Sequence, residues 1–193
     1  LTEVTIPNSV TTIELNAFDS CTSLTEVTIP NSVTTIGNNA FISCTSLTEV
    51  TIPNSVQTIG DSAFLLCTNL REIIVDTANA NYSSADGVLF DKDKTVLIQC
   101  PIGNIRTQYT IPGSVTDIGD KAFDRCTSLT EVTIPNSVTN IGNFAFDSCT
   151  SLTQVTIPGS VTTIGVRAFS ECTSLASVKL NNTNITTIPL GAF

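Results

Sequence analysis

The chain has 193 residues, 41% of them hydrophobic, and its 8 Lys and Arg against 17 Asp and Glu give a formal net charge of −9. No run of basic residues occurs that could contact a phosphate backbone, which argues against nucleic-acid binding. Histidine is absent, which removes the usual general base and the commonest metal ligand, and no apolar run approaches the ~18 residues of a membrane-spanning helix.

A period of 23 residues organises the chain. Repeats start at residues 1, 24, 47, 70, 106, 129, 152 and 175, the fourth is stretched, and the last stops at Phe193. A fixed period of roughly 20–50 residues indicates a solenoid, in which each unit packs only on its neighbours. We therefore predict one repeat domain over 1–193. Because the chain lacks Met and begins on a core position, we expect it to be a fragment of a longer chain.

Each repeat begins with a predicted strand. In the first repeat, Val4 and Ile6 alternate with polar residues, which predicts a short strand over 2–6 with one buried face. Pro7 follows, and because proline lacks the N–H that a strand ladder needs, the strand ends there. Stacked repeat on repeat, these strands predict one parallel sheet of about eight strands.

The return path of each repeat carries a second apolar pattern. Val10 and Ile13 form a predicted buried pair, after which most repeats have a glycine. An Ala-Phe-x-x-Cys segment follows, such as 17–21, which predicts a short helical turn with one buried face. The residue ahead of that turn occupies the position of a helix N-cap in four repeats, as Asn38, Asp61, Asp120 and Asn143.

The fourth repeat departs from the pattern and carries a predicted insertion over 79–105. Its apolar runs at 88–90 and 96–98 are separated by the polar sequence Asp-Lys-Asp-Lys at 91–94. Two apolar runs joined by a short polar turn predict a β-hairpin.

The repeat L-x-x-V-x-I-P-x-S-V-x-x-I-G-x-x-A-F-x-x-C, as in LTEVTIPNSVTTIGNNAFISC at 24–44, resembles the BspA-like 23-residue class of leucine-rich repeats. The resemblance covers the whole chain, although 175–193 looks like an ordinary 24-residue leucine-rich repeat. It implies a right-handed α/β solenoid, rich in β-structure, with the parallel sheet on its concave side. Insertions like that of the fourth repeat recur in the family. Its known members are mostly surface-exposed or secreted proteins of bacteria and some parasitic protists, with proposed roles in adhesion.

Two columns of small residues invite a chemical interpretation. Six cysteines share one repeat position, and Cys100 lies outside it. Coils ~4.7–4.9 Å apart would permit some disulfides, but a buried ladder of small apolar residues satisfies the pattern, so we predict mostly unpaired, inward-facing thiols. Six serines form the second column, at 9, 32, 55, 114, 137 and 160. We expect their hydroxyls to satisfy backbone groups where the chain leaves the strand.

The outward strand face is the candidate partner-binding surface. Its residues are Glu3, Glu26, Thr28, Glu49, Thr51, Glu72 and Glu131, bordered by Asp91, Lys92, Asp93 and Lys94 of the hairpin. Two interpretations stay open: a solvated face that resists association, or a strip that binds a basic or hydroxyl-rich partner. A flat row of carboxylates offers poor convergence for Ca²⁺, and no Gly-rich phosphate loop occurs, so no metal, cofactor or catalytic residue is predicted.

The sequence therefore favours a non-enzymatic binding module for a protein or glycan ligand, at the cell surface or secreted as the resemblance implies. A structural or self-associating surface array is the second hypothesis, since uncapped solenoid ends bury apolar residues only by stacking. An intracellular scaffold is the third, because a ladder of thiols is compatible with a reducing compartment.

Overall fold

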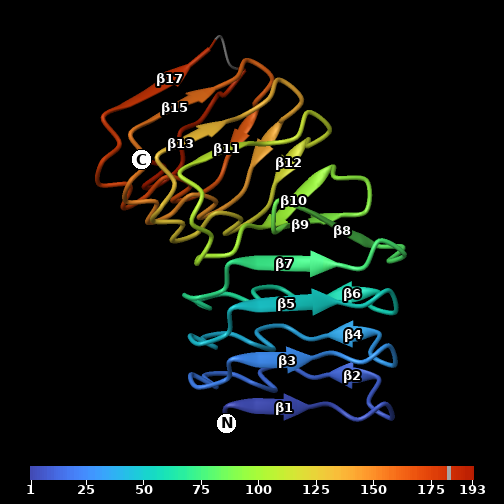
Figure 1. The fold of residues 1–193 in the computed structure, drawn as a ribbon. Coiled ribbons are helices and arrows are strands. Elements are labelled where there is room, and N and C mark those ends of the chain that lie inside the picture. Colours follow the sequence, from blue (N-terminus) through green and yellow to red (C-terminus); the bar gives the residue numbers. More distant parts are fainter. Residues whose placement is uncertain (182–183) are drawn as a thin grey trace. The chain divides into compact units, whose positions relative to one another are not determined.

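The structure is a computed structural model that describes residues 1–181 and 184–193. Two compact units divide the chain. Unit 1 comprises Leu1–Lys92 and Pro101–Asn104, and unit 2 comprises Asp93–Cys100 and Ile105–Phe193. Within each unit, coils of the 23-residue repeat stack on one another to form a β-solenoid (Figure 1).

The predicted strands at the start of each repeat are present and parallel. Those of unit 1 are β1 (Glu3–Thr5), β3 (Glu26–Thr28), β5 (Glu49–Ile52) and β7 (Glu72–Val75). Those of unit 2 are β11 (Gln108–Thr110), β13 (Glu131–Thr133), β15 (Gln154–Ile157) and β17 (Ser177–Leu180). In unit 1, β1 pairs with β3 and β5 with β7, whereas the four strands of unit 2 form one sheet. The register joins equivalent repeat positions, as in Val4 opposite Val27, so the apolar positions all face the core.

A second parallel ladder, which the sequence did not predict, follows the return path. In unit 1 it consists of β2 (Thr12–Ile13), β4 (Thr35–Ile36) and β6 (Thr58–Ile59). In unit 2 it consists of β10 (Val96–Gln99), β12 (Asp117–Ile118), β14 (Asn140–Ile141) and β16 (Thr163–Ile164). The predicted buried pair lies at this ladder, and in the second repeat Val33 and Ile36 have no exposed surface.

The predicted helical turn is wrong, because the described residues contain no helix. Asn16 and Ser20 have a φ of 56°, and the same two repeat positions are left-handed in most other coils. A left-handed residue every fourth position prevents α-helical geometry. The stack also offers the N–H groups better partners: that of Phe18 donates to the Ala40 carbonyl of the next coil at 2.8 Å. A single helical turn would leave such groups unpaired.

The residues predicted as N-caps connect coils instead. Asn38 Oδ1 accepts a hydrogen bond from the N–H of Asp61, its equivalent in the next coil, at 2.9 Å. Asp120 Oδ1 accepts from the Asn143 N–H at 2.7 Å, and Asn143 Oδ1 in turn accepts from the Val166 N–H at 2.9 Å. Because no helix follows, the side-chain oxygen satisfies the neighbouring coil rather than its own.

Columns of stacked phenylalanine rings form the centre of each core. In unit 1, the ring of Phe41 lies 5.0 Å from that of Phe18 and 5.5 Å from that of Phe64. In unit 2, Phe123, Phe146, Phe169 and Phe193 stack with centroid distances of 4.9, 4.9 and 5.6 Å. Stacking at the coil spacing gives nearly parallel rings with centroid distances inside the ~4.5–7 Å range that aromatic pairs favour.

The stretched fourth repeat contains an antiparallel pair that the sequence did not predict, between β8 (Tyr82–Ala85) and β9 (Val88–Asp91) in unit 1. Its turn is Asp86-Gly87, both with positive φ, as a two-residue hairpin turn requires. The fully buried Asn79 anchors this segment. Its Nδ2 donates hydrogen bonds to the Pro53 and Val56 carbonyls. Its Oδ1 accepts hydrogen bonds from the N–H groups of Asn81 and Tyr82, where β8 begins.

Candidate functional site

The outward face of the unit 1 strands carries four glutamates, Glu3, Glu26, Glu49 and Glu72, which we call the Glu strip. All four side chains are exposed, because the alternation of the strand directs the intervening Val4, Val27, Val50 and Ile73 inward. Glu3 lies in register with Glu26, and Glu49 with Glu72. Parallel neighbours lie ~4.7–4.9 Å apart, so their like charges repel.

The Glu strip contains a hollow between its two strand pairs. In the part of unit 1 that the structure describes, no hydrogen-bonded ladder joins β3 to β5. A hollow of about 560 Å³ lies there, lined by Thr25, Glu26, Val27, Thr28, Ile29, Thr48, Glu49 and Thr51. Four of the residues proposed from the sequence therefore lie around one space: Glu26, Thr28, Glu49 and Thr51.

The charge of the chain is concentrated in unit 1. Residues 1–70 contain six acidic residues and no Lys or Arg. Over its full extent unit 1 has ten acidic and two basic residues, a net charge of −8, whereas unit 2 has seven and six, a net charge of −1. A surface with one sign of charge attracts the opposite sign, so the field around the Glu strip favours cations.

The four hairpin residues are divided between the two units. Asp91 and Lys92 belong to unit 1, whereas Asp93 and Lys94 belong to unit 2. The Lys92 Nζ donates to the carbonyls of Thr77, at 3.3 Å, and of Asn79, so its charge is held by the backbone of its own unit. The sequence could not show this, because the carbonyls lie more than ten residues upstream.

The equivalent face of unit 2 is nearly neutral. Glu131 stands in register between Gln108 and Gln154, and the Gln108 Nε2 donates to Glu131 Oε2 at 3.1 Å. A smaller hollow of about 280 Å³ is lined partly by Glu131, Gln154 and Thr156. Without the row of like charges, this face lacks the electrostatic attraction of the Glu strip.

The prediction of mostly unpaired, inward-facing thiols is confirmed. All seven cysteines lie in the described residues and none forms a disulfide; five are buried, and Cys21 and Cys172 are half-buried. The column also has a role that the sequence did not indicate: in four coils the thiol donates to a phenylalanine carbonyl of the preceding coil, as Cys44 does to Phe18 at 3.1 Å. A hydrogen bond with the Cys44 thiol and burial raise the pKa of Cys67 well above its usual range, which keeps that thiol protonated and unreactive.

The position of Cys100, outside the cysteine column, is explained by the same pattern of hydrogen bonds between coils. Its N–H donates to the Ala122 carbonyl, and its own carbonyl faces the Cys126 thiol at 3.8 Å. Those are the contacts of a phenylalanine in other coils, so Cys100 occupies a phenylalanine position.

The serine column follows the prediction in part. Ser55 and Ser160 donate to valine carbonyls of the preceding coil at 2.7 Å, and Ser114 donates to the Lys94 carbonyl at 2.9 Å. The buried hydroxyls of Ser32 and Ser137 have no hydrogen-bond partner. The serine hydroxyls that donate to a backbone carbonyl therefore have a structural role.

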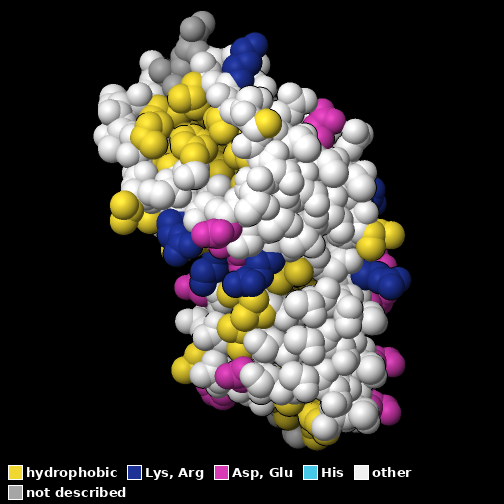
Figure 2. Space-filling view, turned by 90° about the vertical axis from the view of Figure 1, so that its left-hand side faces the viewer, with side chains coloured by type: hydrophobic (Ala, Val, Ile, Leu, Met, Phe, Trp, Pro, Cys, Tyr) yellow, Lys and Arg dark blue, Asp and Glu magenta, His cyan; other side chains and the backbone are white. Residues whose placement is uncertain are grey.

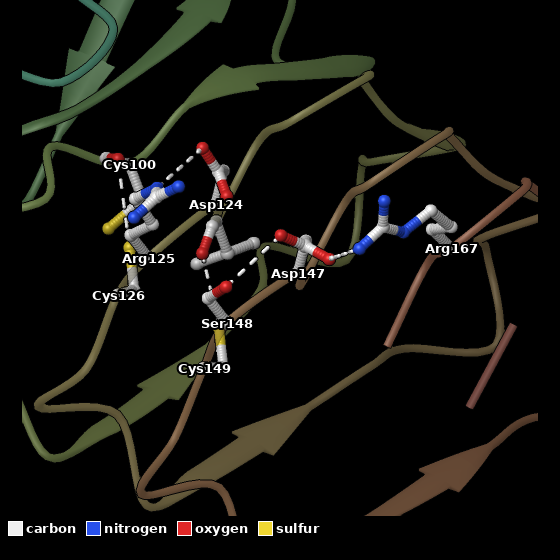
Figure 3. Close-up of polar contacts among 9 residues, drawn as sticks. Cys100, Asp124, Arg125, Cys126, Asp147, Ser148, Cys149 and Arg167 are labelled. Atoms are coloured by element: carbon white, nitrogen blue, oxygen red, sulfur yellow. Dashed lines mark hydrogen bonds and ion pairs between the residues drawn. The ribbon is translucent and has the colours of Figure 1, made fainter. Parts of the chain in front are cut away.

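Two buried carboxylates in unit 2, Asp124 and Asp147, were not singled out from the sequence (Figure 3). Each is 9% exposed, and they occupy the same position of successive coils. Burial raises the pKa of Asp124 to about 6; Arg125 opposes the rise, and the carboxylate of Asp147 adds to it. Carboxylates with shifted pKa values occur in active sites, but burial leaves Asp124 and Asp147 little surface for a substrate.

No group of three or more His, Cys, Asp or Glu side chains able to hold a metal ion occurs among the described residues. Within the same ranges, no helix has the length and apolar character to cross a membrane. Apolar side chains gather on the last coils of unit 2 (Figure 2), where a hollow of about 320 Å³ is lined in part by Phe169, Leu175 and Phe193. These residues continue the columns that other coils bury against one another.

Comparison with known proteins agrees with the repeat. The family model described as a BspA type leucine-rich repeat region matches residues 1–92 and 99–193 in six copies. No curated protein matches the chain. Three solved structures are similar: a leucine-rich repeat protein from Eubacterium ventriosum, the pneumococcal vaccine antigen PcpA and a leucine-rich cell surface protein from Faecalibacterium prausnitzii.

These structures share 28, 26 and 30% sequence identity with the chain, with TM-scores of 0.75, 0.77 and 0.66. The matches cover 99, 92 and 93% of this chain but only 63, 50 and 59% of the other chains, so it spans less than two thirds of their length. The family match covers nearly every residue, and the parallel coils of both units agree with it. The chain therefore belongs to the BspA-type leucine-rich repeat family.

Proposed function

We propose that this chain is a non-enzymatic binding module of a cell-surface or secreted protein, and that the Glu strip of unit 1 binds a cationic protein partner. One observation carries the proposal: unit 1, which holds −8 of the net charge of −9, exposes a row of four glutamates, and two of them, Glu26 and Glu49, line a hollow. The family supports a protein-binding role, and two similar structures are named a cell surface protein and a vaccine antigen.

The composition of the hollow supports a partner that combines charge with hydrogen bonding. Glu26 and Glu49 provide acceptors for Lys or Arg, and the threonines around them provide hydroxyls. Because Glu26 and Glu49 are the two central members of the strip, the hollow lies at its middle rather than at its end. A lysine-rich or arginine-rich segment laid across the strands would relieve the repulsion between neighbouring glutamates.

The rival interpretation is that the Glu strip only keeps the sheet face soluble and free of association. Both interpretations require exposed carboxylates, so exposure alone does not separate them. They differ in whether the position of the charges matters. A soluble face needs charge anywhere on the surface, whereas a binding site needs it at the hollow.

The experiment compares two variants of equal charge. The strip variant replaces Glu26, Glu49 and Glu72 with Gln. The control variant is Glu14→Gln, Asp19→Asn and Asp61→Asn, which removes three exposed acidic side chains of residues 1–70 outside the strip. Binding of a fluorescent hexalysine peptide to the full chain is measured by anisotropy at low and high salt.

We expect the strip variant to lose ~1–2 kcal/mol of binding free energy, about tenfold in Kd, because three surface ion pairs are removed. The control variant should retain most of the affinity, and salt should weaken binding to the unmodified chain. Equal losses in both variants would show that only net charge matters and that the Glu strip is not the site.

A further inference from the structure

Asp124 and Asp147, which we call the Asp pair, occupy a repeat position that does not require a carboxylate. They follow β12 and β14 at the same position of successive coils of unit 2, whereas the second and third coils of unit 1 have Ile42 and Leu65 there. Each aspartate is nine-tenths buried. Because a buried charge is costly unless it is well paired, an acid at this position needs a physical explanation.

The pairing of the buried carboxylates is incomplete. Arg125 Nε lies 3.9 Å from Asp124 Oδ2, and Arg167 Nη2 lies 3.9 Å from Asp147 Oδ1, both beyond hydrogen-bond distance. The Ser148 hydroxyl donates to Asp147 Oδ2 at 3.1 Å. Asp147 Oδ1 is buried and has no hydrogen-bond partner.

The surroundings of Asp124 contain charges of both signs. Arg125 and Lys121 are positive, the Asp147 carboxylate of the next coil is negative, and the buried Cys126 thiol is close enough to respond to the aspartate charge. Arg167 faces Asp147 rather than Asp124 (Figure 3). Its guanidinium also lies over the Phe144 ring, 5.5 Å from the ring centroid. The two arginines therefore lie at the outer sides of the Asp pair, each beside one of the two carboxylates.

Protonation of one member changes this arrangement. Two ionised carboxylates repel each other in a buried site, whereas a carboxylic acid beside a carboxylate removes that repulsion and supplies a donor. We propose that the Asp pair is a proton-operated latch between two coils of unit 2, in which Asp124 takes up one proton from solvent below neutral pH and the two coils then hold together more tightly.

The direction of the effect follows from the pKa of Asp124. Burial, with the Asp147 carboxylate in addition, raises the pKa from 3.8 to about 6 in the folded chain. Because the pKa of Asp124 is higher in the folded chain than in the unfolded chain, protonation stabilises the fold. This contribution is complete at a pH below the unfolded pKa and is lost as the pH rises through the folded pKa of about 6. The equilibrium ratio of the state in which the two coils are packed together to the locally unfolded state should therefore be about tenfold higher at pH 5 than at pH 7.5.

Backbone amides beside the Asp pair report the latch directly. The Arg125 N–H donates to the Asp147 carbonyl across the two coils at 2.8 Å, and the Phe123 N–H donates to the Ala145 carbonyl at 2.7 Å. The Phe41 N–H makes the same contact in unit 1, to Ala63 at 2.8 Å, next to Ile42 instead of an acid. It serves as an internal control for the general effect of pH on the acidic chain.

The experiment measures amide hydrogen exchange by NMR on the full chain at pH 5 and 7.5, corrected for intrinsic rates. We expect the protection of Arg125 and Phe123 to rise about tenfold at pH 5, and that of Phe41 to change little. Asp124→Asn mimics the protonated acid, so its protection should be high at both pH values. Asp147→Asn removes the neighbouring charge, so the pH-dependent change in the amide protection of Arg125 and Phe123, which we call the pH step, should shift to lower pH.

A carboxyl ¹³C titration provides an independent measurement that does not depend on stability. Asp124 should titrate near pH 6. If it titrates near 4, or if Arg125 and Phe123 change no more than Phe41, the latch does not exist. The latch is equally refuted if Asp124→Asn retains the pH step of the unmodified chain, because the step would then arise elsewhere.

Discussion

The close approach of successive coils predicts that Gly142→Ala destabilises unit 2. A Cβ atom at this position would lie 2.6 Å from both the backbone N and the Oδ1 of Asp120, and 2.7 Å from the Gly119 carbonyl carbon. The glycine φ is not positive, so the constraint is space rather than backbone conformation. Ordinary van der Waals contact at 3.4 Å would require the coils to separate by roughly 0.8 Å.

Such a separation would break inter-coil hydrogen bonds. The Gly142 N–H donates to the Ile118 carbonyl at 2.8 Å, and the Asn143 N–H donates to Asp120 Oδ1 at 2.7 Å. Stretched by that amount, neither would remain within hydrogen-bond range. Two lost bonds and the overpacking together predict a loss of ~3 kcal/mol.

Urea unfolding followed by circular dichroism, with amide exchange to identify unit 2, measures this effect. The matched control is Gly113→Ala in the same unit, where a Cβ would meet nothing within 4 Å. We expect the control to change stability by less than ~0.5 kcal/mol. If the two variants unfold at the same urea concentration, close approach is not the reason for the glycine, and the reasoning is refuted.

Three further results are expected. Cys149→Ala should cost ~1–2 kcal/mol in urea unfolding, because it removes a buried thiol and its 3.1 Å hydrogen bond to the Phe123 carbonyl; a change no larger than that of the half-buried Cys21→Ala would contradict this. Titration of the denatured, unreduced chain should find seven thiols, and five or fewer would reveal a disulfide. Asn79→Ala should cost ~3 kcal/mol and increase amide exchange over 79–85, since two carbonyls and two N–H groups lose their partner.

The period of the sequence was sufficient to predict the parallel strands and the residues of the core. Val27 and Phe41 recur at one spacing, and stacked coils can bury a recurrent apolar position only against its equivalent. The Glu strip follows from the same logic, because strand alternation that turns Val27 inward turns Glu26 outward. The sequence thereby predicted both faces of the strands.

Contacts between coils decided what the period could not show. The segment around Phe18 has the composition of a helical turn, but the next coil offers its N–H groups carbonyl partners, and the chain adopts left-handed turns instead. The hollow lined by residues of β3 and β5 forms only when these two strands lie side by side, because each strand supplies part of its lining. Asp124 acquires its raised pKa only when the fold buries it beside Asp147. In each case the deciding partner lies on another coil, and its hydrogen bonds and charges act only once the coils are stacked.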